Sequence, residues 1–178
     1  MPDLVVPFVD LSGQFRALES EFTDAFLDIG RSGTYIMGEP LLSFEERAAE
    51  YCEVNHAIGV GHGSDALFLI LKALGIGPGD EVITPTNSFI ASAWVVVAAG
   101  AKPVLVDVAD NLNIDTSLIE AVITENTRAI IPVHLTGRPA PMREINALAN
   151  RYGLNVVEDA AQAIGARYHG QRVGSLGI

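Results

Sequence analysis

From residue 56 onward, short runs rich in apolar and β-branched residues alternate with longer runs that carry apolar side chains at helical spacing. Such alternation is typical of βαβ units, whose strands lie parallel to one another. The strands we expect are His56–Val60, Glu81–Thr84, Pro103–Asp107, Ala129–Val133 and Asn155–Glu158. The helices we expect between them are Ser64–Leu74, Ser88–Ala99, Thr116–Thr124 and Met142–Tyr152. Because crossovers between parallel strands are right-handed, the pattern predicts an α/β fold with a doubly wound, mostly parallel sheet.

Residues 1–55 precede this alternation and carry a different pattern. Val5–Leu11 is apolar and is expected to be extended, whereas Gln14–Ile29 and Leu42–Glu53 read as amphipathic helices. Gly38-Glu39-Pro40 predicts a turn between these helices. The later joins contain glycine and proline, but none is long enough to separate two domains. We therefore expect a single domain, with an N-terminal helical segment at residues 1–55 and βαβ sheet units at residues 56–178.

The composition limits the partners that the chain can bind. Its formal net charge is −11 and its pI is near 4.6, so it has no basic surface to neutralise the phosphates of nucleic acid or of an anionic membrane. A single cysteine, Cys52, favours a reducing compartment and a cytoplasmic location. The apolar run Ile90–Ala99 is too short to span a bilayer, and no targeting segment is expected. His56, His62 and His169 lack metal-ligand spacing, so we expect no metal site.

The carboxyl end of the last expected strand carries two consecutive carboxylates, Glu158 and Asp159. Ligands of open α/β sheets collect at this edge, and Gln162 follows Asp159 with only alanines between them. This pair suits a flat heteroaromatic ring with a basic nitrogen, because a buried carboxylate keeps a pyridine nitrogen protonated and an amide hydrogen-bonds the ring hydroxyl. The alternative, from the residues alone, is that Asp159 caps a following helix.

A glycine-rich stretch, Gly59-Val60-Gly61-His62-Gly63-Ser64-Asp65, leads from the first expected strand into the next helix. Free N–H groups and the helix dipole attract anions at such a start, and a phosphate there would bind the Ser64 hydroxyl with the Ser64 and Asp65 amides. Neither the Rossmann spacing nor a P-loop lysine is present. The alternative is that Ser64 caps a buried helix while Asp65 complements its dipole.

Two further residues follow expected strands at the same edge. Phe89 follows Glu81–Thr84 and can stack on a planar cofactor, or it can be an ordinary core phenylalanine. His134 follows Ala129–Val133 and can face a substrate as a general base. Since no acidic residue is near it in sequence, the favoured interpretation is a hydrogen-bonded structural histidine.

Six ordered blocks together resemble the DegT/DnrJ/EryC1/StrS family of sugar aminotransferases that depend on pyridoxal phosphate. The resemblance covers nearly the whole chain. It implies the large domain of fold-type I, a three-layer sandwich with a mainly parallel mixed sheet, of which this chain is the N-terminal part. The blocks are Ser32-Gly33-Thr34-Tyr35-Ile36-Met37-Gly38, Phe44-Glu45, Gly63-Ser64-Asp65-Ala66-Leu67, Gly77-Pro78-Gly79-Asp80-Glu81-Val82-Ile83, Pro132-Val133-His134-Leu135 and Glu158-Asp159-Ala160-Ala161-Gln162-Ala163.

The resemblance also implies a set of site residues. It places the phosphate-binding pair on Ser64 and Asp65, the stacking aromatic on Phe89, the pyridinium partner on Asp159 and the ring-hydroxyl partner on Gln162. It implies a homodimer that moves an amino group from glutamate or glutamine to a keto group of a nucleotide-linked sugar, for amino-sugar biosynthesis.

The chain departs from the family pattern in one respect. The Schiff-base lysine of the family lies just beyond the segment that matches Gly174-Ser175-Leu176-Gly177, and the small C-terminal domain lies further on, so neither falls within these 178 residues. The two lysines present, Lys72 and Lys102, are in other blocks. Two alternatives therefore stay open, a dehydratase of the same family that uses histidine in place of the lysine, and a non-catalytic binding or regulatory module.

Overall fold

The computed structural model describes residues 6–177, and the chain divides into two compact units between Ser43 and Phe44. The first unit contains α1 (Leu11–Ser32) and the start of α2 (Glu39–Cys52). The carboxylate of Asp10 caps α1 by accepting the Gly13 N–H at 2.8 Å. The expected turn at Gly38-Glu39-Pro40 is instead the start of α2, since Glu39 and Pro40 lie in its first turn and Gly38 precedes it. A proline there costs no hydrogen bond because the first N–H groups of a helix have no partner within it.

The second unit is built on a parallel sheet. Its strands are β1 (Glu81–Pro85), β2 (Lys102–Val106), β3 (Thr127–Ile130) and β4 (Asn155–Val156), in the order β2-β1-β3-β4. All three neighbouring pairs are parallel. The chain therefore places β1 in the middle, crosses to β2 on one side and then returns past β1 to β3, which makes the sheet doubly wound.

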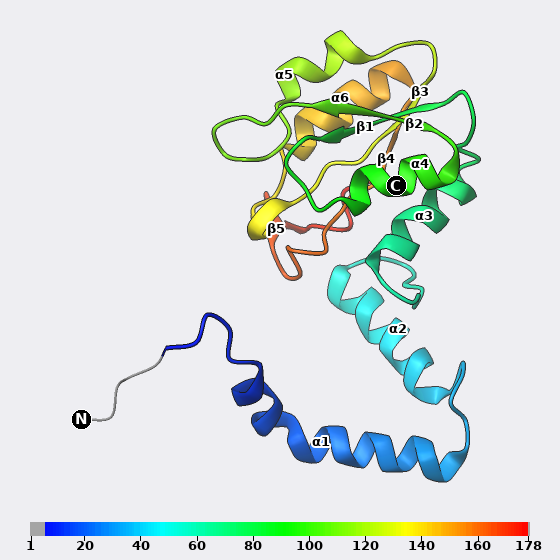
Figure 1. The fold of residues 1–178 in the computed structure, drawn as a ribbon, viewed down its shortest axis with the longest axis vertical. Coiled ribbons are helices and arrows are strands. Elements are labelled where there is room, and N and C mark those ends of the chain that lie inside the picture. The colour runs from blue at the N-terminus through cyan, green and yellow to red at the C-terminus, as the bar shows by residue number, and fades with distance from the viewer. Residues whose placement is uncertain (1–5, 178) are drawn as a thin grey trace. The chain divides into compact units, whose positions relative to one another are not determined.

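Helices cover both faces of this sheet (Figure 1). Of the buried core, one cluster joins α3 (Gly63–Ala73) and α4 (Ala91–Ala99) to Val82, Ala129 and Val157. The other joins α5 (Thr116–Ile119) and α6 (Met142–Tyr152) to Ile83, Ile130 and Val156. Because consecutive strand residues point to opposite faces, each strand supplies both clusters. The predicted three-layer arrangement is confirmed.

Shorter elements complete the second unit. The 3₁₀ turns η1 and η2 cover Glu120–Val122 and Leu135–Gly137. Two short strands, β5 (Arg167–Tyr168) and β6 (Gln171–Arg172), form an antiparallel hairpin that the sequence pattern did not predict.

The prediction of a strand at His56–Val60 is wrong. No strand of the described residues pairs with this segment, and the side chain of Ile58 is 82% exposed. The Gly59 N–H donates to Glu45 Oε1 at 2.7 Å, a side-chain acceptor, where a strand would use a neighbouring carbonyl. The apolar residues of this run alternate in the sequence as those of a strand do. The run is not a strand because no described strand pairs with it.

Five of the six predicted helices have different bounds in the structure, and α1, α2 and α3 differ from the predictions by one to three residues at each end. α4 begins at Ala91, three residues after the predicted start at Ser88, so Ser88 and Phe89 lie in the loop before it. The predicted helix Thr116–Thr124 is divided into α5 and η1. Within the residues that the structure covers, no helix is both long and apolar enough to cross a membrane.

Candidate functional site

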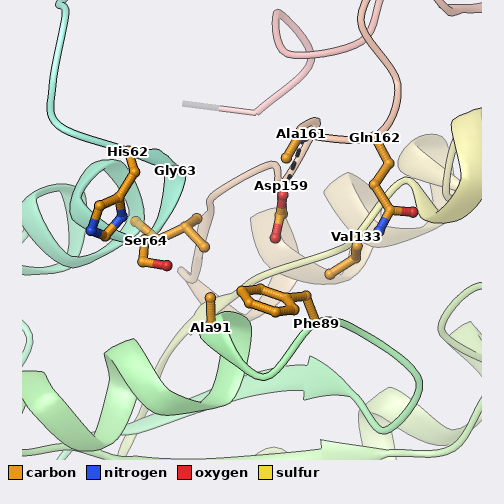
Figure 2. Close-up of a pocket in the computed structure, with 10 residues that line it drawn as sticks. His62, Gly63, Ser64, Phe89, Ala91, Val133, Asp159, Ala161 and Gln162 are labelled. Carbon is orange, nitrogen blue, oxygen red and sulfur yellow. Dashed lines mark hydrogen bonds between the residues drawn. The ribbon is translucent and has the colours of Figure 1, made fainter. Parts of the chain in front are cut away.

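A cavity of about 460 Å³ opens at the carboxyl edge of the sheet (Figure 2). It lies where the loops after β1, β3 and β4 meet the first turn of α3. Its volume lies in the range of small-molecule sites, and its lining is mostly apolar with a few polar groups, as such sites require. The lining residues are His62, Gly63, Ser64, Leu67, Phe89, Ala91, Val133, Asp159, Ala161 and Gln162.

Asp159 reaches the cavity because backbone pairing continues past the ends of β3 and β4. Its N–H donates to Pro132 O at 2.9 Å, and its carbonyl accepts the His134 N–H at 3.0 Å. Both carboxylate oxygens are engaged: Ser92 Oγ donates to Oδ2 at 3.2 Å, and the Ala161 N–H donates to Oδ1 at 3.2 Å. Between Asp159 and residue 177, where the described part of the chain ends, there is no α-helix. The carboxylate therefore faces the cavity in a fixed orientation, and the helix-cap alternative does not describe it.

Ser64 lies at the start of α3, on the cavity side of the helix, and its hydroxyl points toward the cavity in Figure 2. Gly63 and Ser64 precede the first intrahelical bond, from Ala66 N–H to His62 O at 3.1 Å. Their N–H groups therefore remain available to an anion. Asp65, the other residue of the predicted phosphate-binding pair, does not line the cavity.

The side chain of His62 contacts both the backbone N–H and the carboxylate of Asp65. Its Nδ1 accepts the Asp65 N–H at 3.3 Å and so caps α3, while its Nε2 lies 3.5 Å from Asp65 Oδ1. The carboxylate of Asp65 is thus turned toward His62 and away from the cavity. The amide of Asp65 would reach an anion only after the imidazole of His62 had moved.

The ring of Phe89 lies at the cavity, across from Asp159 in the view of Figure 2. It is 67% exposed, which excludes the alternative of an ordinary core phenylalanine in this structure. The loop that carries it leaves β1 at Pro85, so the strand end fixes its position. An exposed ring at the wall of a cavity can stack on a planar ligand.

Gln162 presents a donor to the cavity. Its Oε1 accepts the Thr136 N–H at 2.8 Å, which leaves the amide NH₂ group for a ligand. The backbone of Thr136 is in the left-handed region, with φ of 53°. The loop after β3 and the loop after β4 therefore fix the polarity of the Gln162 amide together.

His134 is fully buried and is not among the residues that line the cavity. Its Nδ1 accepts the Ala140 N–H at 2.9 Å, so the ring proton lies on Nε2, which bonds Glu158 Oε2 at 2.9 Å. The favoured interpretation of a hydrogen-bonded structural histidine agrees with this geometry. Its acidic partner stands 24 positions later in the chain, which a search of the neighbouring sequence could not find.

Glu158 is enclosed by donors. Besides His134, the N–H groups of Gly174, Leu176 and Gly177 donate to it at 2.7, 2.6 and 2.6 Å. Burial acts to raise the pKa of this carboxyl, but these hydrogen bonds outweigh it and hold the pKa below its ordinary value. Glu158 thereby ties residues 174–177 to the end of β4.

Several of these contacts lie outside the sequence prediction. Ser92 had a visible signal, since it interrupts the apolar run Ile90–Ala99, but its partner Asp159 is 67 positions away. Thr136 donates its backbone N–H to Gln162, and the His62 side chain accepts the backbone N–H of Asp65. Contacts that involve a backbone N–H leave no pattern in the sequence. No group of three or more histidine, cysteine or acidic side chains gathers at a metal-binding distance among residues 6–177.

Comparison with known proteins gives a consistent result. The model of the DegT/DnrJ/EryC1/StrS aminotransferase family matches residues 16–178. The chain is 50% identical over 171 residues to a dTDP-3-amino-3,4,6-trideoxy-alpha-D-glucose transaminase of Streptomyces venezuelae. The aligned residues cover 96% of this chain and 45% of that protein. It is 49% identical over 173 residues to a Geobacillus stearothermophilus protein named pleiotropic regulatory protein, with 97% and 46% covered.

Solved structures also resemble this one. DesV of S. venezuelae, in complex with a ketimine intermediate, superimposes with a TM-score of 0.93 at 50% identity over 95% of this chain and 46% of that chain. NtdA of Bacillus subtilis, with bound cofactor PMP, superimposes with a TM-score of 0.88 at 37% identity over 93% and 38% of the two chains. The chain spans about half the length of the curated relatives it matches.

Proposed function

The chain belongs to the DegT/DnrJ/EryC1/StrS aminotransferase family, and from this premise we propose that it forms the cofactor site of an aminotransferase dependent on pyridoxal phosphate. The reaction is the transfer of an amino group from glutamate or glutamine to a keto group of a nucleotide-linked sugar. The name of the S. venezuelae relative, a transaminase of a dTDP-linked amino sugar, supports this substrate class. The bound PMP of NtdA supports the cofactor.

The observation that carries the proposal is the convergence of three different groups on one apolar cavity. A helix N-terminus with the Ser64 hydroxyl, the exposed ring of Phe89 and the carboxylate of Asp159 come from three separate segments of the chain. A phosphate, a flat ring and a basic ring nitrogen are the parts of one cofactor that match these groups. The residues therefore fit pyridoxal phosphate.

Each residue has a distinct role in this proposal. The N–H groups of Gly63 and Ser64 and the Ser64 hydroxyl bind the phosphate, and Phe89 stacks on the ring. Asp159 holds a proton on the ring nitrogen, and the NH₂ group of Gln162 donates to the ring oxygen. The bound cofactor supplies the electron sink and carries the amino group. Asp65 complements the dipole of α3 and, once His62 has moved, offers its amide to the phosphate.

The lysines of the chain do not belong to this site. Lys72 lies in the last turn of α3, about 13 Å along the helix axis from the first turn at Gly63. Lys102 begins β2, at the opposite edge of the sheet, and its Nζ bonds Glu81 Oε1 at 2.8 Å. Neither is placed to reach the cavity. The Schiff-base lysine that the family resemblance implies is therefore assigned to a position after residue 178.

The proposal includes the state and location of the complete enzyme. We infer a homodimer, supported by α1, in which no residue is buried although Phe15, Phe22 and Phe26 are apolar and exposed. A cytoplasmic location agrees with the acidic composition and the single cysteine. Light scattering of the purified full-length protein tests the dimer, and a monomeric mass would contradict it.

The activity is tested with the full-length gene product, pyridoxal phosphate, ¹⁵N-labelled glutamate or glutamine, and a panel of dTDP- and UDP-linked keto sugars. Mass spectrometry is expected to find a nucleotide-linked amino sugar that contains ¹⁵N. An Asp159→Asn variant is expected to lose roughly a hundredfold in turnover, because the ring nitrogen loses its anionic partner. A product that has only lost water would favour the dehydratase, and no product from any sugar would favour the non-catalytic module.

A further inference from the structure

Ser92 makes the one side-chain hydrogen bond that the structure gives to the carboxylate of Asp159 among residues 6–177. It is the second residue of α4, and its side chain is buried, with the residue 1% exposed. Its Oγ lies 3.2 Å from Asp159 Oδ2 and 2.7 Å from Ser88 Oγ. The hydroxyl needs an explanation beyond packing.

The direction of these hydrogen bonds follows from counting protons. Ser88 Oγ also lies 2.9 Å from Phe89 O, so the two hydroxyls carry two protons for three contacts. One contact must lack a proton. The shortest contact, between the two hydroxyls, and the charged acceptor, Asp159, are the two that gain most from a proton. Ser92 therefore donates to Asp159, which leaves the proton of Ser88 for Ser92 Oγ or Phe89 O.

This arrangement fixes the plane of the Asp159 carboxylate. Oδ2 accepts from Ser92 on α4, and Oδ1 accepts from the Ala161 N–H in the loop after β4. Donors from two separate elements leave the carboxylate little freedom to rotate. Its remaining lone pairs are thereby directed at the cavity that it lines.

We propose that Ser92 is a positioning residue, which aims the carboxylate of Asp159 at the ring nitrogen of the bound cofactor. This inference rests on the proposed cofactor site. It differs from a packing role in one measurable respect, because Ser92 acts only on the interaction between Asp159 and the ring nitrogen. Removing the Ser92 hydroxyl should weaken the binding of a ligand that has this nitrogen and should spare a ligand that lacks it.

The test compares two ligands of the full-length gene product, purified without cofactor. They are pyridoxamine 5′-phosphate, which needs no covalent bond to a lysine, and its analogue with a ring C–H in place of the nitrogen. Dissociation constants are measured by calorimetry for the wild type and for Ser92→Ala. The preference of the wild type for the nitrogen-containing ligand should fall about fivefold in Ser92→Ala, the factor that corresponds to one modest hydrogen bond. The Ser92→Thr variant, which keeps the hydroxyl, should restore the preference.

Ser117→Ala is the matched control. Ser117 is also the second residue of its helix, α5, and its hydroxyl also donates to an aspartate, Asp115, at 2.7 Å, but it does not line the cavity. This variant should keep the wild-type preference. Circular dichroism of all variants checks that they fold.

The remaining outcomes contradict the inference. An unchanged preference in Ser92→Ala would overturn it, and an equal loss of affinity for both ligands would reduce Ser92 to a packing role. If the wild type bound neither ligand, the proposed cofactor site itself would fail and the role of Ser92 would fail with it. If the wild type bound both ligands equally, the proposed role of Asp159 would fail, and the role of Ser92 with it. A wild-type preference that Ser92→Ala leaves intact would overturn the inference alone.

Discussion

Glu158 and Asp159 are adjacent in sequence, yet their carboxylates have opposite surroundings. The side chain of Asp159 lines the cavity. That of Glu158 points inward, where four donors surround it. Consecutive side chains at a strand end point to opposite faces, so one acidic residue faces a ligand while the other fixes the protein. Two acidic residues in succession predict the position of a site without saying which residue serves it.

Glu158→Gln should destabilise the protein by about 2–4 kcal/mol. Oε1 accepts from Leu176 and Gly177, and Oε2 accepts from His134 and Gly174. The NH₂ group of a glutamine would therefore meet two donors in either orientation of the amide. Urea unfolding measures the loss, and hydrogen exchange should show faster exchange of the Gly174, Leu176 and Gly177 amides.

The matched control is Glu120→Gln, which changes an exposed carboxylate that is also hydrogen-bonded, to Arg151 and Tyr152. It should change the stability little, because exposed pairs contribute little. Equal stability of Glu158→Gln and the wild type would contradict the assigned role of Glu158.

The same residue predicts how stability depends on pH. The folded pKa of Glu158 lies below its ordinary value of 4.5, because hydrogen bonds outweigh burial. Its contribution is therefore complete above about pH 4.5 and is lost as the pH falls through the folded pKa. The free energy of unfolding of the wild type should decrease over this acidic range more steeply than that of Glu158→Gln.

The secondary-structure elements were predictable where their ends carry a local signal. α6 coincides with the predicted Met142–Tyr152, since Pro141 precedes it and Gly153 ends it in a left-handed conformation. The prediction of a strand at His56–Val60 was wrong because a strand needs a neighbouring strand to pair with. The sequence of the segment carries no information about such a neighbour. The hairpin of β5 and β6, only two residues a strand, is too short for a periodic pattern.

Two helix ends offer a matched pair of stability measurements. Gly100 ends α4 with φ of 91° and Gly153 ends α6 with φ of 67°. An added Cβ at Gly100 would lie 3.2 Å from Pro78 Cδ, whereas at Gly153 it would meet nothing within 4 Å. Gly153→Ala should cost about 1 kcal/mol from the left-handed backbone alone, and Gly100→Ala about 1 kcal/mol more from crowding. Urea unfolding of both variants decides the matter, and an equal or smaller loss for Gly100→Ala would contradict this account.

At the scale of the molecule, the sequence predicted the three layers and the edge of the sheet at which the site lies. Strand ends and a helix start gather Ser64, Phe89, Asp159 and Gln162 because parallel strands share one carboxyl edge. The contacts between loops could not be predicted, because no repeat or spacing in the sequence encodes them. The bond from Ser92 to Asp159 is of this kind, since it joins residues 67 positions apart.

The central claim is that the cavity at the carboxyl edge holds pyridoxal or pyridoxamine phosphate. A crystal structure of the full-length gene product with pyridoxamine 5′-phosphate tests it most directly. The account predicts the phosphate at the N–H groups of Gly63 and Ser64, the ring against Phe89, and the ring nitrogen within hydrogen-bond distance of Asp159. A phosphate bound elsewhere, or a ring nitrogen that faces away from Asp159, would contradict it.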